Sequence, residues 1–157
     1  MTGYLLIAAT LLNSILAGAG LDRIVVQMPA WRRVGARAWA VYSREADLGN
    51  GLFLYPMAAI GGAVLTAVAG VSFYYDGGVP IAAAIPVFTG ALMAVIGLLA
   101  TIKAAPRMLS IRIIDDDPGL RQAFEEFDRW GFIRAIAQML AFVLNLWALV
   151  AVLNRTG

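Results

Sequence analysis

The sequence predicts an all-α integral membrane protein, a four-helix bundle in which residues 1–157 form a single membrane domain. Hydrophobic residues make up 61% of the chain and charged residues 14%, whereas about 25% of a soluble domain is charged. Four apolar stretches also reach the roughly 20 residues that a helix needs to cross a bilayer. Most charged residues lie between those stretches. An ordinary soluble domain is therefore excluded.

The spans follow from where each apolar run begins and stops. The first run could pass for a secretory signal, because LAGAG at 16–20 resembles a small-residue cleavage site. No Lys or Arg precedes it and the apolar pattern continues to Met28, so we favour a membrane span that Pro29 ends. We expect spans at about 4–28, 52–73, 81–104 and 133–153, further helices at about 30–47 and 118–132, and turns at 48–51 and 74–80.

The helix between the first two spans is too polar to cross a bilayer. Trp31, Val34 and Tyr42 fall on one face, and Arg33 and Arg37 fall on the opposite face. An amphipathic helix of this kind can lie at the interface on anionic headgroups. It can equally pack on the bundle as a solvated helix. Both interpretations fit the sequence, and the predicted fold includes the interfacial one.

The fourth span continues a helix that begins in water. Asp117 is expected to cap it, and Pro118 suits its first turn, where the missing N–H needs no partner. Apolar residues then recur at helical spacing, and the stripe that they form meets Arg134, Gln138 and Asn145. We therefore expect a long fourth helix that extends into the cytoplasm and turns its few polar membrane residues toward the protein.

The basic residues are unevenly distributed between the two sides of the membrane. Lys and Arg gather between spans one and two and between spans three and four, while the second loop has none and the C-terminal end only Arg155. The positive-inside rule then places the long loops in the cytoplasm and both termini outside. We expect a multi-pass protein of the bacterial inner membrane.

Several classes of chemistry are excluded by residues that are missing. Cysteine and histidine are absent, so the chain has no disulfide, no thiolate nucleophile and no imidazole metal ligand. It also has no phosphate-binding loop, dinucleotide fingerprint, catalytic triad or zinc-protease motif. We predict no metal site and no cofactor. The basic loops are short and border the membrane, so lipids are the expected partners and nucleic acid is not.

Polar residues gather near the cytoplasmic ends of the spans. Ionisable groups at this depth are costly unless they pair or face a wet cavity, so they indicate a pocket for an apolar small molecule. Asp22 could pair there with Arg134 or Lys103. Alternatively, the cations merely extend to the headgroups, as Lys and Arg near helix ends commonly do. The residues concerned are Asp22, Arg23, Asn50, Tyr55, Lys103, Arg134 and Gln138.

Small residues recur at every fourth position of the second span, at Ala58, Gly62, Thr66 and Gly70. Such a stripe lets a neighbouring helix approach closely. It supports a second hypothesis, a non-catalytic membrane subunit or homo-oligomer that packs through the stripe. Hydrogen bonds between helices are expected from Asn13, Thr66 and Asn145. A small multidrug-type transporter is disfavoured, because no Asp or Glu lies in mid-span.

Four segments of the chain resemble a known family. They are GLDRIVVQMPAWRRVG, YSREADLGNG, TIKAAP and FDRWGFIRAIAQMLAFVLNLWAL. These segments are similar to the small four-span membrane family that includes the anthrone oxygenases, much of which has no assigned function. The resemblance rests on Pro29, on Pro106, and on the entry into the last span at Arg129-Trp130, Arg134 and Ala141-Phe142.

The resemblance implies a possible activity, the cofactor-free oxidation of an apolar phenolic polycycle by dioxygen. Such a reaction requires a base and cations that stabilise an enolate and reduced oxygen. In this chain Asp22 would be the base, and Arg134 would supply positive charge together with Arg23 and Lys103. Tyr55 and Gln138 would orient a carbonyl group. An enzyme or binder of this kind is our first hypothesis, and the non-catalytic subunit is the alternative.

Overall fold

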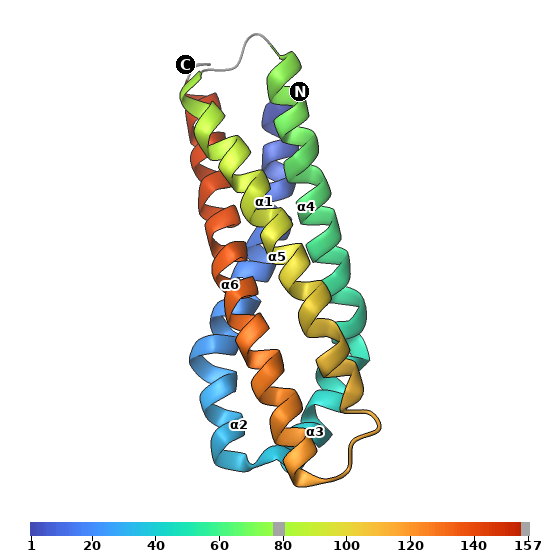
Figure 1. Ribbon diagram of the computed structural model, residues 1–157. Helices are drawn as coiled ribbons and strands as arrows, with labels where there is room; N and C mark the ends of the chain where they lie inside the picture. Colours follow the sequence, from blue (N-terminus) through green and yellow to red (C-terminus); the bar gives the residue numbers. More distant parts are fainter. Residues whose placement is uncertain (77–80, 155–157) are drawn as a thin grey trace.

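The computed structural model describes residues 1–76 and 81–154, and no strand occurs among them. Four long helices form a bundle: α1 (Thr2–Asp22), α4 (Gly51–Tyr75), α5 (Ala84–Ser110) and α6 (Asp117–Leu153) (Figure 1). Each lies in a helical stretch that is long and apolar enough to cross a membrane. The predicted all-α class with four candidate spans is therefore confirmed.

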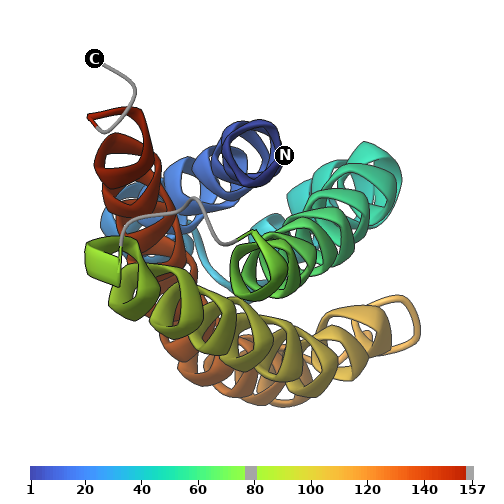
Figure 2. The same cartoon turned by 90° about the horizontal axis from the view of Figure 1, so that it is seen from above.

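The four long helices make a closed ring of neighbours. α1 packs against α4, α4 against α5, α5 against α6, and α6 against α1, as the view along the bundle shows (Figure 2). The contact between α5 and α6 is the most extensive of the four, and that between α4 and α5 is the smallest. The bundle is therefore least tightly closed between α4 and α5.

The first helical stretch does not end at Pro29. After α1 it continues through η1 (Arg23–Gln27), a wide turn of the π-helical kind, into α2 (Met28–Val34). Pro29 occupies the first turn of α2, a position that helices tolerate. α2 ends at Gly35, whose φ of 90° lies in the left-handed region of backbone conformation that favours glycine. The expectation that Pro29 terminates the helix was wrong, and the helix of the third span, expected to end near residue 104, continues past Pro106.

The segment expected as one helix over 30–47 is divided. α3 (Ala36–Glu45) follows Gly35, and η2 (Ala46–Asn50), a second wide turn with a kink at Gly49, leads directly into α4. The break at Gly35 rotates α3 relative to α2. Trp31 is buried, while Val34 in the same helix and Tyr42 beyond the break are exposed, so the single apolar face predicted for these three residues was wrong.

The start of α6 also differs by one residue from the expectation. The carboxylate of Asp116, and not that of Asp117, caps the helix by accepting a hydrogen bond from the Gly119 N–H at 2.8 Å. Asp117 is the first helical residue and binds Arg121 one turn later. Of the turn expected at 74–80, residues 77–80 lie outside the described part of the chain, as does Arg155.

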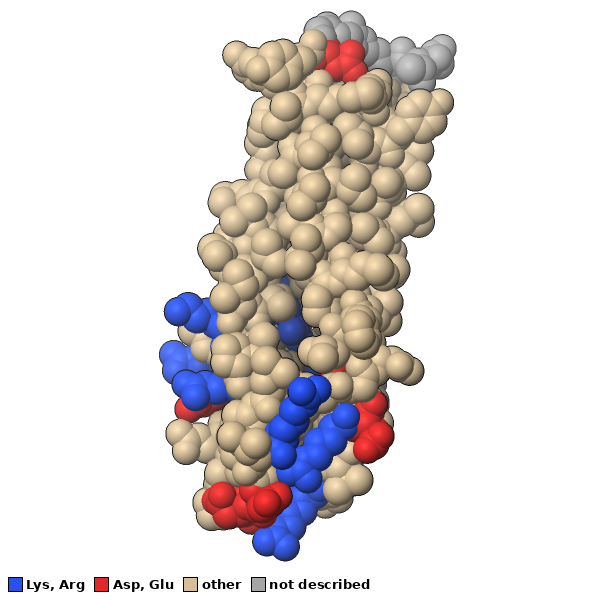
Figure 3. Space-filling view, turned by 90° about the vertical axis from the view of Figure 1, so that its right-hand side faces the viewer, with Lys and Arg blue, Asp and Glu red and all other residues tan. Residues whose placement is uncertain are grey.

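The charged side chains lie mainly at the end of the bundle that carries α2 and α3. Figure 3 shows Lys and Arg gathered there, below a long apolar surface. At the opposite end the N-terminal ammonium group lies 3.4 Å from Asp76. The hydrogen bond from that ammonium group holds the pKa of Asp76 below its usual value. We call the end with α2 and α3 the basic end.

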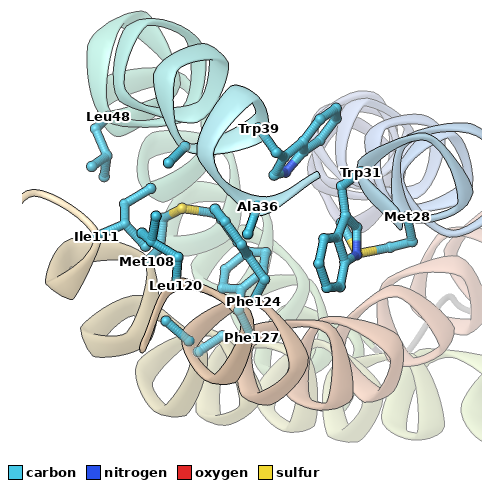
Figure 4. Packing of buried hydrophobic residues seen from close by; sticks show 13 residues of the cluster. Met28, Trp31, Ala36, Trp39, Leu48, Met108, Ile111, Leu120, Phe124 and Phe127 are labelled. Atoms are coloured by element: carbon cyan, nitrogen blue, oxygen red, sulfur yellow. The ribbon is translucent and has the colours of Figure 1, made fainter. Parts of the chain in front are cut away.

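The buried core changes in character along the bundle. At the basic end it consists of large side chains from α2, α3, α5 and α6, including Trp31, Trp39, Met108 and Phe124 (Figure 4). Between the four long helices the buried residues are mainly small, for example Ala9, Ala58, Ala63, Ala69, Ala94, Ala141 and Ala148. The long helices therefore pack closely, whereas α2 and α3 are held by a core that resembles that of a soluble protein.

Candidate ligand pocket

A pocket lies at the border between the two kinds of core. All four long helices line it, together with both wide turns. Its volume of about 120 Å³ is several times the ~10–15 Å³ that one water molecule needs. The lining is mostly apolar, and the polar and charged residues in it are Arg23, Gln27, Asp47, Tyr55, Thr101, Arg134 and Gln138.

Arg23 and Asp47 form a buried ion pair in this pocket. The two guanidinium Nη atoms donate to the two carboxylate oxygens at 2.8 and 3.1 Å, a bidentate geometry that is among the stronger ones. The side chains are only 10% and 9% exposed. Arg23 opens η1 and Asp47 lies in η2, so the two wide turns bring the partners together.

Arg134 lies in the same pocket without an anionic partner. Among the described residues its side chain forms no hydrogen bond and no ion pair, and its only close partner is the ring of Phe127, 5.4 Å from the guanidinium carbon. The guanidinium carbon of Arg23 lies 4.6 Å from the centre of the same ring. Since Asp47 is the one carboxylate in the described lining, the pocket carries a formal charge of +1.

Gln138 follows Arg134 by one helical turn and faces the same space. The residue is 5% exposed, yet its amide has no hydrogen-bond partner among the residues that the structure describes. The pocket therefore presents one free guanidinium group and one free amide on a single face of α6.

The structure brings together four of the seven residues that the sequence placed in a polar layer. Arg23, Tyr55, Arg134 and Gln138 line the pocket, whereas Asp22, Asn50 and Lys103 are exposed and lie outside the lining. Asp22 accepts a hydrogen bond from Gln27 at 2.6 Å. It therefore does not form the pair that we expected with Arg134 or Lys103.

Sequence reasoning did not single out Asp47. The residue lies in YSREADLGNG, shortly before an apolar run, and nothing in the local pattern distinguishes it from the other charges there. The available signal was a requirement of charge balance, because a cation at the end of the first span needs an anion from another segment.

Among the described residues, no group of three Asp or Glu side chains gathers that could hold a metal ion.

The small-residue stripe of α4 packs within this chain. Ala58, Gly62, Thr66 and Gly70 are all buried, and a Cβ atom on Gly62 would lie 3.2 Å from the Asn13 side-chain oxygen. The Thr66 hydroxyl accepts hydrogen bonds from the amides of Asn13 at 3.2 Å and Asn145 at 3.1 Å. The expected hydrogen bonds between helices are thus confirmed, and the stripe is occupied by neighbours from the same bundle.

Comparisons with protein-family models, curated proteins and solved structures find no match for this chain. The resemblance to the anthrone oxygenase family is therefore neither supported nor contradicted.

Proposed function

We propose that this protein is a membrane-embedded binding protein for a small, largely apolar molecule that carries a negatively charged or hydrogen-bond-accepting group. One observation carries the proposal. Arg134 and Gln138 face an apolar pocket on one side of α6, and neither has a polar partner among the described residues. Buried polar groups are normally paired, so an unpaired set in a cavity favours a ligand.

The proposed setting is the inner membrane of a bacterium, with the basic end in the cytoplasm and both termini outside. The gathering of Lys and Arg at one end supports this orientation through the positive-inside rule (Figure 3). α6 has 37 residues and is about 55 Å long, while the hydrocarbon core is about 30 Å thick. A crossing α6 therefore extends beyond the membrane at the basic end.

The same setting gives α2 and α3 an interfacial role. Both helices bury one face on the aromatic core and expose Arg33 and Arg37 beside Val34 and Val41. Exposed cations beside exposed aliphatic residues suit a surface in contact with anionic headgroups. We propose that α2 and α3 lie at the cytoplasmic interface.

The pocket supports binding better than the oxidation that the family resemblance implies. A base is needed for that oxidation, but Asp47 is already held by both Nη groups of Arg23. Asp22, the expected base, is exposed and outside the lining. The alternative of an oligomer that packs through the stripe of α4 is also disfavoured, because the stripe is buried within the chain.

Native mass spectrometry of the gently solubilised protein tests the proposal. We expect a stoichiometric organic adduct on the wild-type protein, and its loss in Arg134→Ala at a normal folded yield. Lys103→Ala is the matched control, because it removes an exposed cation outside the pocket and is expected to keep the adduct. An adduct that persists in Arg134→Ala, or a bare wild-type protein, would contradict the proposal.

A further inference from the structure

We infer that the ligand is a membrane-soluble monoanion of the long-chain carboxylate type, which enters the pocket sideways from the bilayer between α4 and α5. The inference rests on the proposed binding function and names the ligand class and its route. Three features of the pocket carry it: its charge, the spacing of its free donors and the place where it opens.

The charge of the pocket matches a single negative charge. Arg23 and Asp47 neutralise each other, which leaves Arg134 as the uncompensated cation of the described lining. A neutral ligand would leave this cation unpaired, and a dianion would add an excess negative charge at low dielectric, which is costly. One monoanion restores neutrality.

The free donors suit a carboxylate. The Arg134 guanidinium group can donate to both oxygens of a carboxylate, and Gln138, one turn further along α6, can donate to one of them. The cavity of about 120 Å³ has room for such a head and the nearest methylene groups. The rest of an acyl chain would lie in the gap between the helices, whereas a diacyl phospholipid would have to bring its glycerol backbone through the same gap.

The pocket opens on an apolar face of the bundle. Figure 3 shows a hollow on this side, with atoms of basic side chains visible at its floor. Leu52 of α4 and Leu109 of α5 line the pocket and are also 39% and 41% exposed, so they form the two sides of the opening. Other apolar residues of α4 and α5, such as Phe53 and Ile102, are exposed as well. An opening bordered by hydrocarbon admits a molecule dissolved in lipid.

The contacts between the helices agree with this route. Of the four contacts in the ring, the one between α4 and α5 is the smallest, so separating these two helices disrupts the least packing. A molecule arriving from the bilayer therefore meets Leu52 and Leu109 first and Arg134 last. The route and the anchoring charge are consequently separable by mutation.

The experiment uses the full chain in phosphatidylcholine nanodiscs, with oleate, oleyl alcohol and phosphatidylglycerol as probes and native mass spectrometry as the readout. We expect stoichiometric binding of oleate, at least tenfold weaker binding of oleyl alcohol, and at least tenfold weaker binding of oleate to Arg134→Ala. Exchange of bound oleate for deuterated oleate should slow at least fivefold in Leu109→Trp. It should stay unchanged in Leu99→Trp, which alters an exposed residue of α5 outside the lining.

The outcomes separate this inference from the proposed function. Equal binding of oleyl alcohol, or preferential retention of phosphatidylglycerol, would overturn the carboxylate assignment. Unchanged exchange in Leu109→Trp would overturn the sideways route. A different adduct that Arg134→Ala removes and oleate does not displace would overturn the inference and support the proposed function. A wild-type protein that carries no adduct and binds no probe would overturn both.

Discussion

Two layers of the bundle place a buried amide of α6 against a glycine of α5, but only one of them gives that amide a hydrogen-bond partner. One layer contains Asn13, Thr66, Gly90 and Asn145, and we call it the bonded layer. The other contains Gly20, Ala59, Gly97 and Gln138, and we call it the open layer. Each residue of the open layer lies seven positions from its counterpart on the same helix, which is about two turns. The layers are therefore equivalent levels of one bundle.

The approach of α5 to α6 is the same in both layers. A Cβ atom on Gly90 would lie 3.3 Å from the Asn145 side-chain oxygen, and a Cβ atom on Gly97 would lie 3.2 Å from Cγ of Gln138. In each case a glycine of α5 lets a buried amide of α6 lie close to the helix backbone. The difference between the layers must therefore come from α1 and α4.

In the bonded layer α1 and α4 supply polar partners, and in the open layer they do not. Asn13 and Thr66 form a network with the amide nitrogen of Asn145, whose side-chain oxygen is buried without a partner. Gly20 and Ala59 offer Gln138 no hydrogen-bonding side chain. Both line the pocket, and Gly20 also lets α1 approach α6, because a Cβ atom on it would lie 2.9 Å from Cβ of Ala135. The comparison teaches that the pocket arises where two helices of a regular bundle carry small apolar residues instead of partners.

The largest predicted effect concerns the ion pair beside the open layer. Asp47→Ala leaves Arg23 buried without its anion, and breaking a buried pair by removing one partner costs about 3–5 kcal/mol. We expect a loss of stability of about 3 kcal/mol, at the low end, because water in the pocket can reach Arg23. Reversible unfolding in mixed detergent micelles measures it.

The matched control for this prediction is Asp128→Ala. The pair of Asp128 with Arg32, at 3.1 Å, is partly exposed, and burial raises the pKa of Asp128 despite the nearby cation. A pair of this kind contributes about 0–1 kcal/mol. Equal losses of stability for Asp47→Ala and Asp128→Ala would show that the buried pair in the pocket contributes no more than a partly exposed one.

The next effect concerns the bonded layer. Thr66→Val keeps the shape of the side chain but removes the acceptor for the amides of Asn13 and Asn145. We expect a loss of about 1–3 kcal/mol, since a buried group without a partner costs that much. Ligand occupancy, read by native mass spectrometry, should stay unchanged.

Thr10→Val serves as its control, because the Thr10 hydroxyl donates only to the Leu6 carbonyl of its own helix and lies outside the pocket lining. Its loss should stay below that of Thr66→Val. If Thr66→Val abolished the adduct while Thr10→Val did not, the two layers would be coupled and their separation would be wrong.

Sequence periodicity predicted the residue that α6 contributes to each layer. The apolar stripe of the fourth span places Arg134, Gln138 and Asn145 toward the protein, and the structure buries both amides, because a helical period depends on one segment alone. The same reasoning could not find Asp47, whose role depends on a partner 24 residues away. It also could not find the pocket, which depends on what Gly20 and Ala59 lack.

Proline was misleading for a related physical reason. Pro29 was expected to end a helix, but a proline in the first turn of a new helical segment breaks no hydrogen bond. The wide turn η1 before Pro29 makes that arrangement possible, and η1 and η2 also position Arg23 and Asp47. Single-segment rules therefore predicted the number of candidate spans and missed the turns that build the site.

The smallest predicted effect is also the most direct test of the comparison. Ala59→Thr gives the open layer the hydroxyl that Thr66 gives the bonded layer, at the equivalent position of α4. The new hydroxyl can accept from the Gln138 amide, so we expect stability to rise by about 0.5–1.5 kcal/mol, the net contribution of one hydrogen bond. It also occupies part of the pocket, so the adduct should be lost or weakened. The unfolding and mass measurements above report both effects.

A double-mutant cycle with Gln138→Leu shows whether the gain comes from that bond. In the Gln138→Leu background Ala59→Thr has no amide to accept from, so its stabilising effect should vanish. The control, Ala63→Thr, places a hydroxyl one turn away at a buried position outside the pocket lining, and it should not stabilise. If Ala59→Thr stabilised equally in both backgrounds, it would act by filling space. Gln138 would then need no partner, and the hypothesis that the open layer binds a ligand would be contradicted.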